Sequence, residues 1–389
     1  MDILFVSHCV PYPPDKGEKI RAWHELQALG AKHRVHLVCF AKNEKEAAQA
    51  QELKDCCASI FAQPLGAYRA LARAALGFAA GLSLNVSYYR SALMRRHIES
   101  LRPHLAAVLV YSSAVVQFAP AGVPLYIDFV DVDSEKWREY GARRQPGALY
   151  RMEANRLRAC EARYAQSARC TFITTPREQR ILETIAPGAR VESIMNGVDF
   201  DFFDPARLPG ESEAQRDCIV FVGQMNYFPN VDACRWFAES VFGELRAQFP
   251  ALEFLIVGRD PVPTVRQLAG IPGVRVTGPV PDVRPYLASA LAMVAPLRIA
   301  RGVQNKVLEA LVMGKRVLAS PEVASTFGES VPEGITVCKT AGDYARALPG
   351  SWDPQPQIRE TARTRFCWER NLLPLIQELE GARTPAPVL

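Results

Sequence analysis

Short apolar runs alternate with segments of helical periodicity from the start of the chain. Residues 2–8 and 34–41 (DILFVSH and RVHLVCFA) are apolar and rich in residues that favour strands. Between them, over residues 17–33, apolar side chains recur at every third position from Ile20 to Leu29, which is a helical spacing. The pattern predicts a strand, a helix and a second strand.

The same alternation begins again after residue 216, where apolar runs at 218–224 and 252–259 flank a helical stretch at 231–249. Strands that alternate with helices form parallel sheets covered on both faces, so we predict an α/β protein with two Rossmann-like domains. Ligands of such sheets bind beyond the carboxyl ends of the strands, and the expected site is therefore an interdomain cleft between two facing sheets. Further strands are predicted at 274–278, 290–296 and 315–320.

Proline, glycine and polar residues interrupt any regular period between residues 199 and 217, and breaks of this kind separate domains. We therefore expect an N-terminal domain at 1–205 and a C-terminal domain at 206–365, both Rossmann-like. A helix is predicted at 365–382. Residues 366–389 would then be a C-terminal helix and tail, with packing of this helix back on the first domain left open.

Composition narrows the class of protein. The chain has 389 residues and a formal net charge of +5, and no apolar run approaches the roughly 18 to 20 residues that span a bilayer. Its first residues lack the basic leader and cleavage site of a signal peptide, so we expect a cytoplasmic protein. The ten cysteines form no C-x-x-C pair, which favours reduced thiols over disulfides or a metal site. Aromatic and basic residues do not interleave as in nucleic-acid-binding proteins.

The stretch ARGVQNKVLEAL at residues 300–311 carries the clearest candidate chemistry. Gly302 would let the backbone approach a ligand, and the N–H groups of residues 303–305 would face an anion at a helix start, with Lys306 adding positive charge. Glu309 could accept two hydroxyl hydrogen bonds from a ribose. The alternative is that Lys306 and Glu309 form an ordinary surface pair three residues apart.

Several motifs, taken in order, resemble the retaining nucleotide-sugar glycosyltransferases of family 4, which have two Rossmann-like domains in the GT-B arrangement. They are IMNGVDFDFFDP, FVGQMNYFPNVDA, FLIVGRDP, VTGPVPDVRPYLASA and VAPLRIARGVQNKVLEALVMGKRVLAS. Two N-terminal stretches, PYPPDKGEKIRAWHEL and DFVDVDSEKWREY, resemble sugar transferases of bacterial exopolysaccharide and exosortase (PEP-CTERM) gene clusters.

The resemblance implies that Glu309 binds the nucleotide ribose and that the backbone before it binds the phosphates. Two positions depart from the family. Arg301 stands where relatives have a glutamate that contacts the donor sugar, and Gln224 stands where many have an arginine that neutralises the diphosphate. Lys306, or an arginine near it, would have to supply the charge. The donor-binding candidates are Gly223, Gln224, Arg259, Arg301, Gly302, Val303, Gln304, Asn305 and Glu309.

The first domain contributes two further groups of candidates. The resemblance implies that Lys16, Gly17 and Lys19 form a loop near the acceptor or a phosphate, whereas the residues alone also fit an ordinary turn before a helix. Asp131 and Asp133 would offer a polar contact or base at the cleft, or would cap the helix that follows. His8 ends the first strand, where a cleft is expected. The candidate catalytic residues are Lys306, Asp131, Asp133 and His8.

The stretch 67–102 holds six arginines and one acidic residue, together with a weak helical stripe of Leu71, Leu76 and Phe78. It suits contact with an anionic membrane surface, where a lipid-linked acceptor would lie, or simply a solvated helix pair.

The resemblance implies a glycosyltransferase of the hexosyltransferase type that acts with retention and needs neither metal nor cofactor, with the acceptor side in the first domain and the nucleotide-sugar in the second. Its donor would be a nucleotide-diphosphate sugar, and its acceptor a glycan or lipid-linked glycan of exopolysaccharide biosynthesis, at the inner face of the plasma membrane. Two alternatives stay open: a nucleotide-sugar epimerase of the same fold, and a catalytically impaired binding partner in a polysaccharide assembly complex.

Overall fold

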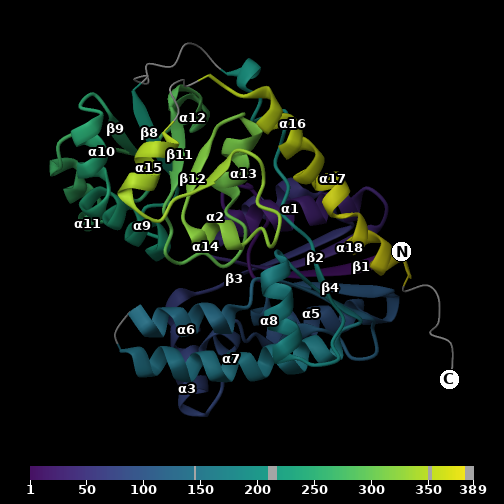
Figure 1. Cartoon of the computed structure of the whole chain (residues 1–389). Helices are drawn as coiled ribbons and strands as arrows, with labels where there is room; N and C mark the ends of the chain where they lie inside the picture. The colour runs from purple at the N-terminus through teal and green to yellow at the C-terminus, as the bar shows by residue number, and fades with distance from the viewer. Residues whose placement is uncertain (144–145, 209–216, 349–352, 382–389) are drawn as a thin grey trace. The chain divides into compact units, whose positions relative to one another are not determined.

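The structure is a computed structural model that describes residues 1–143, 146–208, 217–348 and 353–381 (Figure 1). The chain divides into two compact units. The first comprises Met1–Ile194 and Leu372–Leu389, and the second comprises Met195–Asn371. Among the described residues, no helix is long and apolar enough to cross a membrane.

The first unit is built on a seven-stranded parallel sheet with the order β3-β2-β1-β4-β5-β6-β7. The chain moves outward from β1 to β3 and then returns to the other side of β1 with β4, so the strand order reverses between β1 and β4. Ligands of open α/β sheets bind at such a reversal, beyond the carboxyl ends of the strands. The strands are β1 (Asp2–Ser7), β2 (Arg34–Ala41), β3 (Ser59–Pro64), β4 (Ala107–Tyr111), β5 (Leu125–Val130), β6 (Cys170–Ile173) and β7 (Val191–Ser193).

Helices cover this sheet, and α6 and α7 run side by side (Figure 1). The last helix, α18, returns to the first unit, where the Tyr126 hydroxyl of β5 donates a hydrogen bond to the Glu378 carbonyl at 2.9 Å. The helices are α1 (Gly17–Gly30), α2 (Glu44–Gln49), α3 (Ala67–Ala79), α4 (Leu84–Tyr88), α5 (Ala92–Leu101), α6 (Asp133–Arg143), α7 (Gly147–Ser167), α8 (Pro176–Ile185) and α18 (Leu373–Gly381).

A fully buried charge cluster fixes α1 to the sheet of the first unit. Arg21 Nε donates to Asp128 Oδ2 at 2.7 Å, and its Nη1 donates to the Ile194 carbonyl at 2.8 Å. Glu25, one turn along α1, lies 3.1 Å from Arg21 Nε, and burial together with the neighbouring Asp128 raises the pKa of Glu25 well above its usual range. Arg21 and Asp128, whose Oδ2 lies 2.6 Å from Arg21 Nη2, form a paired core contact, as buried charges require.

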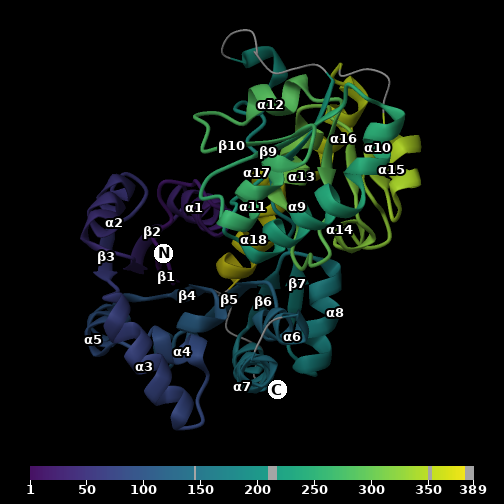
Figure 2. The ribbon, with the colours of Figure 1, turned by 90° about the vertical axis from the view of Figure 1, so that its left-hand side faces the viewer.

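The second unit repeats the same plan with six parallel strands in the order β10-β9-β8-β11-β12-β13, so its strand order reverses between β8 and β11. Its strands are β8 (Cys218–Val222), β9 (Glu253–Val257), β10 (Val274–Gly278), β11 (Ala292–Ala295), β12 (Val317–Ala319) and β13 (Ile335–Val337). Its helices, shown from a second side in Figure 2, are α9 (Phe228–Ser240), α10 (Phe242–Gln248), α11 (Pro263–Arg266), α12 (Arg284–Ser289), α13 (Asn305–Val312), α14 (Pro321–Ser325), α15 (Ala341–Ala347), α16 (Pro356–Arg365) and α17 (Trp368–Asn371).

The α/β prediction is confirmed, and two predicted helices are broken in the structure. The stretch 231–249 divides into α9 and α10 at Val241, whose φ of −122° lies outside the helical range. The stretch 365–382 divides into α17 and α18 at Leu372, where the chain passes from the second unit to the first. Helical periodicity did not reveal either break because the apolar spacing continues across both.

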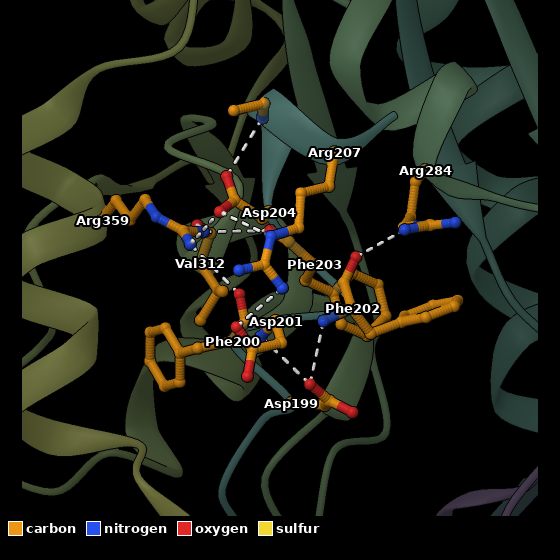
Figure 3. A network of polar contacts seen from close by, with 11 residues as sticks. Asp199, Phe200, Asp201, Phe202, Phe203, Asp204, Arg207, Arg284, Val312 and Arg359 are labelled. Carbon is orange, nitrogen blue, oxygen red and sulfur yellow. Dashed lines mark hydrogen bonds and ion pairs between the residues drawn. The ribbon is translucent and has the colours of Figure 1, made fainter. Parts of the chain in front are cut away.

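The division between the units lies at residues 194 and 195 rather than at the expected 205 and 206. The segment 199–207 contains the polar and proline residues of a linker, but arginines hold it on the second unit (Figure 3). Arg359 donates to the carbonyls of Phe203 at 3.0 Å and Phe200 at 3.1 Å, and Arg284 donates to the Phe202 carbonyl at 2.6 Å. Since Phe200 and Phe203 also pack against the core of this unit, the segment belongs to it.

Candidate functional site

The carboxyl end of β8, beside the reversal of strand order in the second sheet, brings together two candidates from distant parts of the chain, Gly223 and Lys306. Gly223 follows β8 directly, and a Cβ atom there would lie 2.8 Å from Asn230 Nδ2 and 2.9 Å from Lys306 Nζ. Gly258 follows β9, and its Cβ would lie 1.7 Å from the Gly223 carbonyl oxygen. Glycine at both positions therefore lets the two strand ends and the two polar side chains meet.

Lys306 reaches this point from the first turn of α13. Its Nζ donates to Asn230 Oδ1 at 2.6 Å and lies 4.1 Å from the centroid of the Phe221 ring. Asn230 is buried, and its Nδ2 donates to the Gln224 carbonyl at 2.9 Å. Among the described residues Lys306 forms no ion pair, so its ammonium is held by a neutral amide and an aromatic face. Burial disfavours the charged form and lowers the pKa of Lys306 to about 8.

Glu309 lies on the same helix and is half-buried. Burial raises the pKa of its carboxyl to about 7, against a smaller opposite effect of Lys306. The surface pair that the sequence left open does not form, because Lys306 points to Asn230. Within the described part of the chain, no hydrogen bond engages the Glu309 carboxylate, so its oxygens stay available as acceptors.

The start of α13 is open to an anion. Gln304 occupies the N-cap position without a side-chain cap hydrogen bond, and the first turn contains no acidic residue. The Gln304 side chain instead donates from Nε2 to the Gly302 carbonyl at 3.0 Å. Asn305 Oδ1 accepts a hydrogen bond from Asn196 at 2.8 Å, which ties the helix start to the segment before 199–207. Uncapped N–H groups and the positive end of the helix dipole attract anions.

The nearby arginines differ from Lys306 in their surroundings. Arg298 is held by a two-point pair with Asp232, whose Oδ2 lies 2.9 Å from Arg298 Nε. Arg259 and Arg301 are half-buried in the loops after β9 and before α13. Lys306 lies at the end of β8 and, within the described part of the chain, forms no ion pair.

The first unit contains a cavity of about 630 Å³. It lies beyond the carboxyl ends of β1, β2, β3 and β4 and thus spans the reversal between β1 and β4. His8 and Asp133 both line it, which brings together two of the predicted catalytic residues. The lining residues are His8, Cys9, Glu18, Phe40, Ala41, Lys42, Glu46, Leu65, Ala67, Asn85, Tyr88, Tyr89, Ser112, Ala114, Asp133, Lys136, Trp137 and Tyr140.

Aromatic rings fix the His8 side chain. Its ring stacks on Tyr111 at 5.8 Å and 9°, and meets Tyr89 edge-on at 6.1 Å and 86°. Asp133 Oδ2 accepts a hydrogen bond from Ser113 at 3.2 Å. Asp131 does not line the cavity: it is tucked against Thr174, which donates to its Oδ1 at 3.0 Å, and burial raises its pKa.

The turn between β5 and α6 places these two aspartates. It begins at Val130, whose φ of 68° is strained for a β-branched residue. Buried glutamates of α7 and α8 hold the turn: Val132 N donates to Glu178 at 2.8 Å, and Ser134 N donates to Glu161 at 3.0 Å. The helix start is thus satisfied by distant carboxylates. The sequence alone did not point to Glu161 or Glu178, because their hydrogen-bond partners are backbone groups.

The predicted loop at residues 16–19 is placed at the start of α1. Lys16 precedes the helix and Gly17 is its first residue. Lys19 is buried, and its Nζ lies 2.6 Å from Glu46 Oε1, so its charge is already neutralised. We therefore do not retain Lys19 as a phosphate ligand.

Sequence reasoning also missed Asn230, although a polar residue amid the apolar positions of α9 was a signal. The described residues contain no group of three or more metal-ligating side chains.

Comparison with known proteins bears on this geometry. Residues 216–349, which lie within the second unit, match the family described as "Glycosyl transferases group 1". No curated protein sequence matches the chain. Its structure is similar to sucrose-phosphate synthase from Thermosynechococcus elongatus, with 15% identity, coverage of 97% of this chain and 98% of that one, and a TM-score of 0.69.

Two other similar structures extend the comparison. Anabaena HepE, solved in complex with UDP and glucose, is 13% identical with 98% and 100% coverage and a TM-score of 0.66. WaaG, a glycosyltransferase involved in lipopolysaccharide biosynthesis, is 16% identical with 99% and 96% coverage and a TM-score of 0.59. The chain has the GT-B fold. The predicted fold class is confirmed, and the roles of the site residues stay predictions.

Proposed function

We propose that this protein is a glycosyltransferase that takes a sugar from a nucleotide-diphosphate donor bound at the end of β8 in its second unit. The observation that carries the proposal is the Lys306 ammonium, held 2.6 Å from Asn230 Oδ1 without an acidic partner. The uncapped start of α13 lies on the same helix. The match of residues 216–349 to group 1 glycosyltransferases supports the same interpretation.

The chemistry follows from where charge develops. When the bond from the sugar to the diphosphate breaks, negative charge grows on the leaving diphosphate, and Lys306 with the α13 N–H groups would stabilise it without reorganising. Hydrogen-bond donors that are fixed before the reaction usually contribute most to the rate enhancement of an enzyme. In a retaining transfer the leaving diphosphate itself would take the acceptor proton. Glu309 would accept hydrogen bonds from the ribose, and Arg301 would contact the donor sugar or a phosphate.

The acceptor would be a glycan or a lipid-linked glycan of exopolysaccharide assembly, modified at the inner face of the plasma membrane without a metal. The N-terminal motifs support this assignment. A peripheral membrane contact is favoured by α3, where Tyr68, Leu71 and Leu76 are 90%, 60% and 73% exposed. Arg69 on the same helix is exposed and would face anionic lipids.

The first experiment is a thermal-shift screen of the full chain against UDP-, GDP-, ADP- and dTDP-sugars, because a ligand of the folded state raises the melting temperature. Sugar transfer from the donor that binds is then measured with a panel of glycan acceptors. Lys306→Met should abolish transfer, whereas Lys339→Met, at an exposed lysine of the same unit, should not. Formation of an epimer of the donor without acceptor, or donor binding without turnover on any acceptor, would contradict the proposal.

A further inference from the structure

The first and last residues of the second unit are bonded to each other. The unit begins at Met195 and ends at Asn371. The Asn371 side chain donates from Nδ2 to the carbonyl of Met195 at 3.0 Å and to that of Asn196 at 3.3 Å. The backbone at Asn196 is therefore held by the residue at which the chain leaves the unit.

Packing also fixes this segment. A Cβ atom on Gly197 would lie 2.6 Å from Trp368 Cγ, so a glycine lets the backbone lie directly against that ring. Val198 N donates to the Phe366 carbonyl at 2.9 Å, and Asn196 is 5% exposed. Because a close-packed, hydrogen-bonded backbone does not shift without losing these contacts, the Asn196 side chain extends from a fixed position.

The Asn196 side chain reaches the start of α13. Its Nδ2 donates to Asn305 Oδ1 at 2.8 Å, and Asn305 is the first residue of that helix. A carboxamide whose oxygen accepts a hydrogen bond still has two N–H donors on its nitrogen. Within the described part of the chain, no hydrogen bond engages Asn305 Nδ2, so this half-buried side chain keeps its donors for a ligand.

The next residue of the helix is held in the same way. Lys306 Nζ donates to Asn230 Oδ1 at 2.6 Å, so Asn305 and Lys306 are each fixed by an asparagine from a distant segment. Asn196 and Asn230 are both 5% exposed. A side chain that is already held in its binding orientation loses less conformational freedom when a ligand arrives. The first turn of α13 is thus ordered before a donor binds.

We propose that Asn196 is a positioning residue for the donor. By holding Asn305 Oδ1 it turns the Asn305 amide nitrogen toward the diphosphate, where its N–H groups add to Lys306 and to the backbone N–H groups at the start of α13. Asn196 acts through Asn305 and touches no atom of the ligand. The inference rests on the proposed function and deepens it, because it makes the segment that begins the second unit part of the donor site.

The test is a double-mutant cycle on nucleotide binding by the full chain, measured by titration calorimetry. The probe is whichever of UDP, GDP, ADP and dTDP the parent binds most tightly. Asn196→Ala and Asn305→Ala should each weaken binding about fivefold, as expected for the loss of one neutral hydrogen bond. When Asn305→Ala is already present, Asn196→Ala should have no further effect, because a residue that acts through another contributes nothing once that other is removed.

Three comparisons separate positioning from a merely structural role. The matching nucleoside, which lacks the phosphates, should bind every variant as it binds the parent. Gln248→Ala removes an exposed carboxamide of the same unit, and Phe242→Leu lowers stability from within its core; both should leave nucleotide affinity unchanged. Asn196→Ser is a second variant at the same position, and the melting temperature of each variant shows whether it is folded.

The outcomes also separate this inference from the proposed function. Weaker binding of the nucleotide but not of the nucleoside, with no added effect in the double variant, supports the inference. It is overturned, with the proposed function left standing, if folded variants at Asn196 bind the nucleotide as the parent does, if the two substitutions weaken binding additively, or if the nucleoside loses as much affinity. A parent that binds none of the four nucleotides would refute the proposed function and this inference together.

Discussion

The pH dependence of nucleotide binding is a sensitive test of the Lys306 assignment. In the unliganded protein burial lowers the pKa of Lys306 to about 8, so the side chain changes charge in an accessible range. A diphosphate bound beside Nζ favours the ammonium form and raises this pKa. Below about pH 8 the lysine is charged with or without nucleotide, and its protonation no longer changes the affinity. Above it, binding must first protonate the lysine, and affinity falls.

The magnitude follows from the pKa. One pH unit above a pKa of about 8, about one tenth of the unliganded protein has a charged Lys306. The dissociation constant of UDP should therefore rise about fivefold between about pH 8 and pH 9, and by up to about tenfold for each further pH unit, which corresponds to 1.36 kcal/mol. At about pH 8, binding should also take up about half a proton. The phosphates are already ionised there, because their last pKa is about 6.

Titration calorimetry in two buffers of different ionisation enthalpy measures both quantities. Lys306→Met should bind UDP weakly at every pH and take up no proton near pH 8, and Lys339→Met should behave as the parent. The stability of the unliganded protein provides an internal check of opposite sign. Because the folded pKa lies below the unfolded value of 10.5, the stability contribution of Lys306 increases as pH rises above about 8. A UDP affinity that is constant up to about pH 9, with no proton uptake, would refute the reasoning.

Three further outcomes are expected. Glu309→Gln should weaken UDP binding about tenfold without lowering the melting temperature, because the charge-assisted bonds to the ribose are lost. The UDP affinity of the parent should also fall as the pH drops below the Glu309 pKa of about 7. Unchanged UDP binding of the variant in calorimetry would exclude the ribose role. Asn230→Leu removes the hydrogen-bond acceptor that favours the charged form of Lys306. The pH at which UDP affinity is half lost on the alkaline side should therefore move below about 8, whereas a merely structural role of Asn230 would leave this pH unchanged. Arg359→Met leaves the carbonyls of Phe200, Phe203 and Val312 without their charged donor. It should lower the free energy of unfolding, measured by urea titration, by about 2 kcal/mol or more. Arg266→Met, at an exposed site, should not change this free energy.

The sequence predicted β1, β2, β8, β9, β10, β11 and β12, most of which are apolar runs buried on both faces of a sheet, but it did not predict β3 to β7 or β13. It predicted less where a contact between distant residues decides the structure. Apolar spacing continues through Val241 and Leu372, so the sequence did not predict that helices end at these two residues. Segment 199–207 has the composition of a linker, and only the contacts of Arg284 and Arg359 reveal that it belongs to the second unit.

The candidate site likewise separates what local sequence patterns can predict from what contacts between distant residues decide. The strand-end glycine Gly223 and the helix residues Lys306 and Glu309 could be proposed from the sequence because each lies within one recognisable pattern. The partner of Lys306 could not be, since Asn230 lies 76 positions away and nothing in a single sequence pairs the two. Lys19 was misjudged for the same reason: a basic residue beside a glycine suggests a phosphate loop, but Glu46 neutralises it within the fold.

The two sheets share one topological feature and differ in the chemistry placed at it. Each reverses its strand order beside its first strand, β1 or β8, and each gathers candidate residues beyond that strand. At β8 the fold presents a lysine without an acidic partner and an uncapped helix start, which suit a ligand with two phosphates. Beyond β1 the lining carries aromatic rings together with two carboxylates, Glu18 and Asp133, and two lysines, Lys42 and Lys136. The two strand ends therefore differ in their charges, and under the proposed function the diphosphate of the donor is expected at β8, beside Lys306.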